Sequence, residues 1–537
     1  MFNQILLEES VLNKKQNKAN KKRLVEQKIF IPSVVITLLV SIPLAIYPDA
    51  SMDILNHLFN EIVTLFQWGY IWYAVILVVV GFYFAFSKYG NVVLGDPQAK
   101  PRFNLFEYAS ILIAMGLGST IMRTALVQWA EVTNSPPTGV EPQSMEAFLW
   151  GNSYSMFIWS FQTFAVFVVA APALAYVLHV RKRPFMRISE ACRTIFGDKF
   201  TDGVGGVVLD IIFMISILSG AAVTLGLGTP IVTYNIAELF GIDQSFMLTF
   251  IVTIVWVLMF TISAYRGLDK GIKILSTFNM YLAGAFAIFV LLIGPGVFIL
   301  NYFTQSLGFL FSNYVDTFLY TNSIGGDGDT HIEGHKVFWF AYNATWAMLH
   351  SVFAAKVSYG RTIKEMIMTY FMAPMLLAWG ATGILGGLGI ERQLTGQINA
   401  LDTVTEDPMA VVPEILTSLP LAPVVLVAFI ILAIIFLTTT LDSTTYSIAS
   451  YTGKEDMSDS EPSKKLRILI AFVITFFALT LLAIGGLEPL EVVSGLMGIP
   501  VIIVQFLTIY AAFKMMNEDK AWIYNIREED KSRSKRD

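Results

Sequence analysis

The chain has 537 residues, of which 55% are hydrophobic and only 14% are charged, so a soluble globular fold is excluded. The net charge of −5 is small for this length and gives no reason to expect nucleic acid as a partner. The single cysteine, Cys192, excludes an internal disulfide and a cysteine-based metal cluster. We therefore expect an all-α polytopic membrane protein.

About twelve segments are long and apolar enough to cross a bilayer, at roughly 20 residues per crossing. In chain order they lie near residues 29–47, 68–88, 105–133, 153–179, 207–234, 245–264, 274–301, 336–356, 368–390, 421–447, 466–485 and 489–513. The third, eighth and tenth are interrupted by polar residues, so they are the weakest helix predictions and the best candidates for a site.

The third segment has a weak centre. Between Ala114 and Thr120 it contains two glycines, Gly116 and Gly118, and Arg123 follows at bilayer depth. Paired glycines destabilise a helix, and a charge at this depth must be satisfied by other protein groups. Broken backbone within a membrane occurs where it is buried in protein or lines a cavity, so this segment predicts a ligand or ion site.

Two polar stretches separate the seventh and eighth spans. Residues 302–318 are expected to form an interfacial helix. The run 323–336 contains His331, Glu333 and His335, and two histidines four residues apart could bind a metal on one helix face. The glycine-rich sequence around them favours the alternative, a solvated external loop.

The tenth segment contains threonines and an aspartate within an apolar run. Thr438, Thr439 and Thr440 are followed by Asp442. These groups either form an oxygen-rich cation site or a structural network in which the hydroxyls bond back to the helix.

Basic residues occur in alternate loops. With twelve helices, the N-terminal arm, residues 181–183, 266–273, 361–364 and 464–467, and the C-terminal tail all fall on one side. The positive-inside rule makes that side the cytoplasm and places both termini there. We expect the membrane to be the plasma membrane.

Several motifs, taken in order, resemble the betaine/choline/carnitine transporter family over nearly the whole chain. They are Gly116-Leu117-Gly118, Thr224-Leu225-Gly226-Leu227-Gly228, Gly267-Leu268-Asp269-Lys270-Gly271, Ser358-Tyr359-Gly360-Arg361 and Gly485-Gly486-Leu487-Glu488. The resemblance implies two inverted five-helix repeats (105–301 and 336–513) with 302–335 between them. Two extra helices (29–104) precede the repeats, and the cytoplasmic arms are 1–28 and 514–537. It also implies a homotrimer surrounded by membrane lipids.

By the same resemblance, the coupling ion and the substrate lie near the midplane. The positions that match the family's sodium ligands are Ala114, Leu117, Phe436, Thr439 and Thr440. No cofactor other than this sodium ion is expected. In the fourth segment, the positions that match the aromatic cage for a quaternary ammonium are Trp159, Phe164 and Phe167, all of them aromatic. Without the resemblance, these three residues would be read as packing residues.

The eighth segment departs from the family pattern. Tyr342 and Trp346 keep their aromatic character, but the principal cage tryptophan is replaced by Asn343. In the third segment, Arg123 and Gln128 replace a family phenylalanine and glutamate. We expect Arg123 either to bind a substrate carboxylate or to replace the coupling cation; a structural ion pair with Glu131 or Asp442 is the alternative.

His350, in the eighth segment, is either a proton relay or a hydrogen-bonded core side chain. The function expected from these features is import of a small zwitterion, betaine-like or amino-acid-like, with sodium and by alternating access, as in an osmoprotective symporter. A sodium-independent exchanger that uses Arg123 is the alternative. A membrane enzyme is remote, because no nucleophile elbow, HExxH motif or phosphate loop is visible.

Overall fold

A computed structural model describes residues 25–115, 118–137, 139–267, 271–321, 331–453, 462–485 and 488–527. Within these ranges the chain is helical, and β-structure is limited to isolated bridges such as Val25 with Gly453. The predicted all-α class is confirmed.

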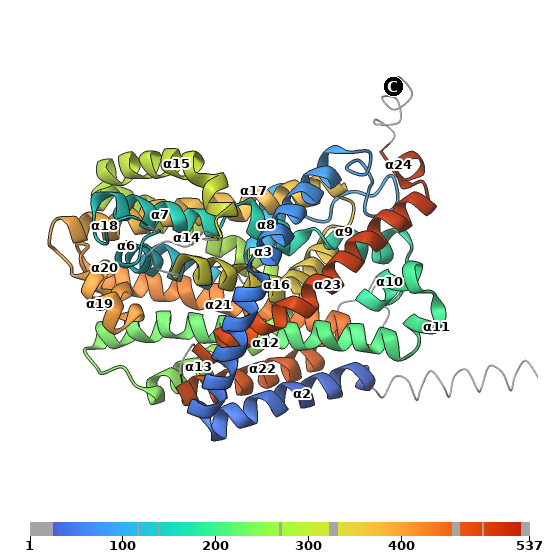
Figure 1. The fold of residues 1–537 in the computed structure, drawn as a ribbon, viewed down its shortest axis with the longest axis horizontal. Coiled ribbons are helices and arrows are strands. Elements are labelled where there is room, and N and C mark those ends of the chain that lie inside the picture. The colour runs from blue at the N-terminus through green and yellow to red at the C-terminus, as the bar shows by residue number, and fades with distance from the viewer. Residues whose placement is uncertain are drawn as a thin grey trace, which may run out of the picture.

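The first half begins with two long helices and continues with two segments that are broken into shorter pieces (Figure 1). The elements are α2 (Gln27–Ile46), α3 (Pro48–Phe86), α4 (Leu105–Ile113), α5 (Gly118–Arg123), η1 (Thr124–Gln128), α6 (Trp129–Asn134), α7 (Met145–Ile158), α8 (Phe161–Val168), α9 (Ala171–Ala175), η2 (Tyr176–Val180), α10 (Ile188–Phe196), α11 (Asp198–Thr201), α12 (Val204–Phe240), α13 (Phe246–Gly267), α14 (Lys273–Ile293) and α15 (Gly296–Leu319).

The second half contains α16 and the helices that follow it. They are α16 (His331–Val357), α17 (Ile363–Ala381), η4 (Thr382–Gly386), α18 (Gly387–Leu394), α19 (Ala400–Glu406), η5 (Pro408–Ala410), α20 (Val411–Thr417), α21 (Ala422–Thr452), α22 (Lys464–Gly485), α23 (Glu488–Glu518) and α24 (Ala521–Tyr524).

Each of the twelve predicted spans coincides with a helix or a run of helices. Seven described stretches are long and apolar enough to cross a membrane by length and composition. They are Leu65–Phe86, Met145–Val180, Val204–Ala221, Lys273–Ile293, Ile363–Leu394, Ala422–Thr452 and Gly498–Glu518. Large apolar side chains are exposed on their outer faces, as at Ile288 and Leu292 of α14, which suits contact with lipid.

Local sequence signals explain where several helices begin. Asn104 and Glu107 form a reciprocal capping box at the start of α4, and Thr362 and Glu365 form another at the start of α17. Ser144 caps α7 by accepting a hydrogen bond from the backbone of Ala147. These caps fix the entry points of helices that contribute to the candidate site or lie beside it.

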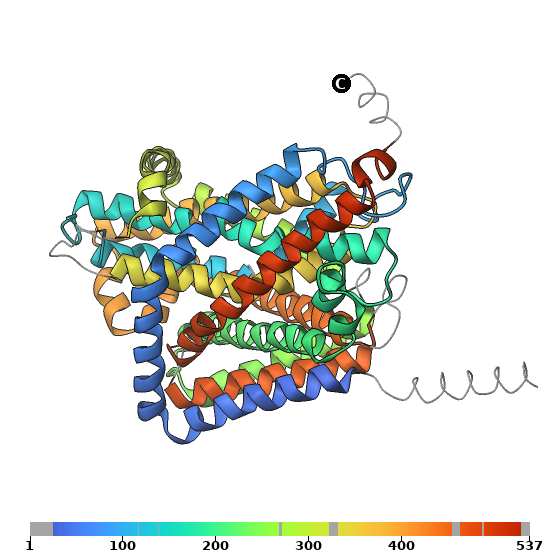
Figure 2. The ribbon, with the colours of Figure 1, turned by 45° about the vertical axis from the view of Figure 1, so that its right-hand side comes forward.

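The central helix α16 is enclosed by other helices. It packs against α8 and α9 on one side and against α12, α21 and α23 on others. Figure 1 shows α3 and α23 crossing the bundle, and their aromatic rings meet: Phe84 and Phe513 stack with centroids 4.3 Å apart. In Figure 2, α2 and α22 lie side by side along one edge, where they also pack together. Most of α16 is therefore shielded from the surroundings.

The predicted external loop is wrong at residues 331–335, which form the first turns of α16. The physical reason lies in the contacts of the following residue. Lys336 is fully buried, and its ammonium donates to the carbonyls of Thr317 (3.0 Å) and Tyr320 (2.5 Å) at the C-terminal end of α15. A cation at a helix C-terminus is favourable, so this contact holds the start of α16 against α15.

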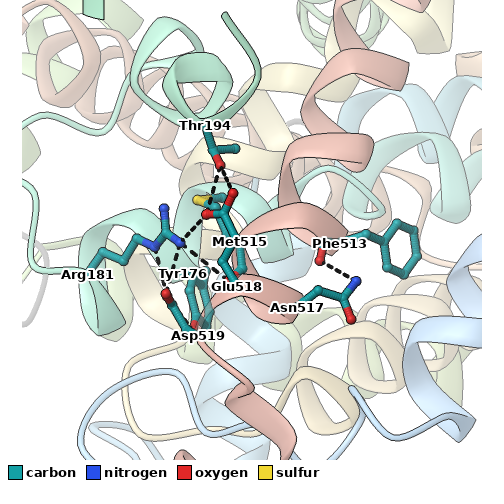
Figure 3. Close-up of polar contacts among 8 residues, drawn as sticks. All are labelled: Tyr176, Arg181, Thr194, Phe513, Met515, Asn517, Glu518 and Asp519. Atoms are coloured by element: carbon teal, nitrogen blue, oxygen red, sulfur yellow. Dashed lines mark hydrogen bonds and ion pairs between the residues drawn. The ribbon is translucent and has the colours of Figure 1, made fainter. Parts of the chain in front are cut away.

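Ion pairs fix the end of α23 (Figure 3). Arg181, directly after η2, binds Asp519 at 2.8 Å and Glu518 at 2.9 Å. The Tyr176 hydroxyl also donates to Asp519, and the Thr194 hydroxyl of α10 donates to Glu518. Arg181 is one of the basic residues that predicted the cytoplasmic side, and here it joins the fourth segment to the last long helix.

Candidate functional site

The interruption of the third segment lies beside α21. Helix α4 ends at Ile113, the buried residues Ala114 and Met115 follow, and α5 begins at Gly118. Gly116 and Leu117 lie outside the described residues. A side chain at Gly118 would overlap the ring of Phe436, so the glycine permits α5 and α21 to approach closely.

The threonines of α21 differ in how their hydroxyls are used. The Thr439 hydroxyl bonds back to the carbonyls of Ile435 (3.0 Å) and Phe436 (2.9 Å). The Thr440 hydroxyl is buried and has no hydrogen-bond partner among the described residues. Because a hydroxyl oxygen has two lone pairs, both threonines keep acceptor capacity for a cation.

Asp442 is committed to a structural ion pair. It binds Arg467 of α22; the two side chains are 0% and 1% exposed, and Arg467 also lies 5.3 Å from the ring centre of Tyr446. Arg467, near the start of the predicted span 466–485, therefore has its charge compensated by Asp442 inside the bundle. An ion site beside Thr440 would thus be built from neutral oxygens.

Trp159, Phe164 and Phe167 form one aromatic wall along the fourth segment. Trp159 sits where α7 ends and α8 has not begun, and its ring centre is 6.2 Å from that of Phe164. Phe164 and Phe167 are also 6.2 Å apart, and all three are almost fully buried. The wall continues onto α16 through Trp339, 5.8 Å from Trp159, a residue that the sequence analysis missed.

One face of α16, the stripe that meets this wall, contains Trp339, Asn343, Trp346 and His350 at helical spacing. Asn343 donates to the Thr163 hydroxyl of α8 at 2.9 Å. His350 stacks on Phe167 with ring centres 4.2 Å apart and also lies 5.6 Å from Trp346.

Trp346 of this stripe and Tyr342 beside it both contact α12. The Tyr342 hydroxyl lies 3.4 Å from the Thr224 hydroxyl, and Trp346 packs against Gly220. Six predicted substrate residues are thus brought together at α16. Tyr342, Asn343 and Trp346 belong to α16 itself, Phe164 and Phe167 to α8, and Trp159 lies between α7 and α8.

His350 is also hydrogen-bonded to the Tyr370 hydroxyl of α17 through Nδ1. It is therefore a hydrogen-bonded core side chain, as one of the two expectations had it.

Arg123 and Gln128 lie on the third segment, which meets the aromatic wall where Trp159 donates to the Thr124 hydroxyl at 3.1 Å. Arg123 forms an ion pair with Glu131 at 2.7 Å, the alternative that the sequence left open. Nε2 of Gln128 lies 3.3 Å from Nε2 of His335, and Nε1 of Trp339 donates to the same His335 nitrogen at 3.1 Å. His335, which was expected to be either a metal ligand or part of an external loop, thus joins the third segment to α16. No cluster of three or more metal-binding side chains occurs in the described ranges.

A cavity of about 230 Å³ lies on another side of α21, between α5, α14, α17 and η4. Its lining consists only of apolar side chains and glycines, and includes Gly118 and Phe436 but none of the wall residues. A charged or strongly polar ligand would find no polar partner in this cavity.

Comparison with known proteins gives a family match over most of the chain. The family model described as betaine/carnitine/choline family transporter matches residues 28–521. A solved structure of a Na⁺-coupled sialic acid symporter, in a substrate-bound outward-open state, is similar over 83% of this chain and 87% of that chain. Its sequence identity is 15% and its TM-score is 0.48.

Proposed function

Because the chain belongs to the betaine/carnitine/choline transporter family and is therefore a secondary transporter, we propose that it imports a small zwitterionic solute together with sodium. Import would occur by alternating access across the plasma membrane, with both termini cytoplasmic. We also propose a homotrimeric assembly and a role in osmoprotection, as the family resemblance implies.

The observation that carries the sodium proposal is the unpartnered Thr440 hydroxyl, one helical turn after Phe436, whose ring meets Gly118 at the interruption of the third segment. Leaving a buried hydroxyl without a hydrogen bond is unfavourable, and a hard cation bound there would satisfy its oxygen. The end of α4 at Ala114 supplies carbonyls that are no longer used in a continuous helix. The proposed ligands remain Ala114, Leu117, Phe436, Thr439 and Thr440.

The pairing of Arg123 argues against the exchanger alternative. A guanidinium that replaces a coupling cation must add a positive charge to the site, whereas Glu131 already balances that of Arg123. The proposed substrate site consists of Trp159, Phe164, Phe167, Tyr342, Asn343 and Trp346, with Arg123 and Gln128 as its proposed members on the third segment. Counterflow in sodium-free vesicles would support the exchanger instead.

Purified protein tests the proposal directly. We expect a zwitterionic solute to raise the unfolding temperature in sodium and not in potassium, because binding to the folded state stabilises it by about 2.7 kcal/mol at 100 times the Kd. Equal stabilisation in the two salts would contradict sodium coupling.

Replacing Thr440 by valine should remove one ion ligand at nearly constant volume. We expect the sodium concentration for half-maximal stabilisation to rise by about tenfold, corresponding to a loss of about 1.4 kcal/mol. Thr438→Val is the matched control, since its hydroxyl bonds back to Ile434 at 2.8 Å and it points about 200° around the helix from Thr440. A similar change in both variants would remove Thr440 from the ion site.

A further inference from the structure

We propose that the substrate carries at least one N–H on its amine, and that Oδ1 of Asn343 accepts this hydrogen. The inference rests on the proposed function and narrows it from zwitterions in general to those with a primary, secondary or tertiary ammonium group. A quaternary ammonium, with no N–H, would then be a poor substrate.

The hydrogen bonds around Asn343 determine which way its amide faces. The Thr163 hydroxyl has one proton, which it donates to the carbonyl of Ile158 at 2.6 Å. Its lone pairs remain as acceptors, so the group that meets Thr163 at 2.9 Å must be the NH₂ of Asn343. The carbonyl oxygen Oδ1 therefore faces away from Thr163.

Oδ1 of Asn343 is buried and accepts no hydrogen bond from the described residues. An unpaired amide oxygen alone does not define a site, since Asn152 and Asn235 have one too. The surroundings distinguish Asn343. Oδ1 of Asn152 lies against the backbone of Gly386, whereas Asn343 sits between Trp339 and Trp346 on α16.

Aromatic rings alone do not select one kind of ammonium group over another. Cation–π attraction acts on any cation near the ring face and does not need an N–H. An acceptor among the rings adds a requirement: an N–H satisfies Oδ1, while a trimethylammonium excludes water from Oδ1 and leaves it unpaired. A site built to bond a substrate N–H strongly rejects the analogue that lacks it.

An N-methylation series isolates this requirement. Glycine, N-methylglycine, N,N-dimethylglycine and N,N,N-trimethylglycine differ only in methyl groups, and only the last has no N–H. We expect N,N-dimethylglycine to bind more tightly than N,N,N-trimethylglycine, by a factor of about ten or greater. Thermal stabilisation of the full-length protein in sodium measures this difference. The same series built on 4-aminobutanoate covers a longer spacing between amine and carboxylate.

Variants of Asn343 test whether its oxygen is the cause. Asn343→Leu should abolish the drop in affinity between the dimethyl and the trimethyl compound. Asn343→Trp should make the trimethyl compound the tightest ligand. Asn152→Leu, a change of an equally buried asparagine outside the wall, should keep the wild-type order.

The outcomes separate this inference from the proposed function. Tightest binding of the trimethyl compound by the wild-type protein would overturn the inference and leave zwitterion transport standing. A drop in affinity for the trimethyl compound that persists in Asn343→Leu would also overturn the inference. Failure of every compound in both series to stabilise the protein would contradict the proposed function itself, and the inference with it.

Discussion

Asp442→Asn is expected to lower the free energy of unfolding by about 3–5 kcal/mol, because it leaves the buried Arg467 guanidinium without its carboxylate. Thermal unfolding of the purified protein in detergent measures the effect. Asp96→Asn is the matched control: its ion pair with Lys182 spans 3.1 Å between side chains that are each 64% exposed. An exposed pair contributes only about 0–1 kcal/mol.

The double variant Asp442→Leu with Arg467→Leu separates the two charges from the packing. Removing both buried charges avoids an uncompensated ion, so we expect it to be more stable than Asp442→Asn. If Asp442→Asn and Asp96→Asn unfold at the same temperature, the ion pair between α21 and α22 does not contribute as described.

The second large effect is expected at Gly118. Gly118→Val should reduce uptake by about 100-fold, because its side chain would overlap the Phe436 ring and separate α5 from α21. The measurement is initial uptake of the tightest-binding compound of the N-methylation series in proteoliposomes, normalised to the amount of folded protein.

Gly284→Val is the control for this variant. Gly284 of α14 lines the same cavity, but an added Cβ there meets no heavy atom within 4 Å. Gly284→Val should therefore retain nearly normal uptake. Normal uptake in Gly118→Val would show that the close approach of α5 and α21 is not needed for transport.

The fold was largely predictable because apolar length is a strong signal in a membrane protein. Each expected span contains helix, including the interrupted third and fourth segments. The contacts that the sequence did not indicate involve charged residues. Arg467 and Lys336 were read as polar flanks, yet one pairs with Asp442, 25 positions earlier, and the other caps α15. Such partners are fixed by helix packing, which hydropathy does not report.

The candidate site was predictable only in part, and its residues remain predictions. The family resemblance selected Trp159, Phe164 and Phe167, and the described ring contacts bring them together. Trp339 and His335 were missed because their role depends on which face of α16 meets the third and fourth segments. A clearer signal was available: Trp339, Asn343, Trp346 and His350 form a single helical stripe.

Sodium-driven accumulation is the most direct test of the account. Wild-type protein in proteoliposomes, given the tightest-binding compound of the N-methylation series, should concentrate it above the external level when sodium is high outside and low inside. With equal sodium on both sides, the internal concentration should only reach the external one. Accumulation that is the same when potassium replaces sodium would contradict sodium-coupled import through this site.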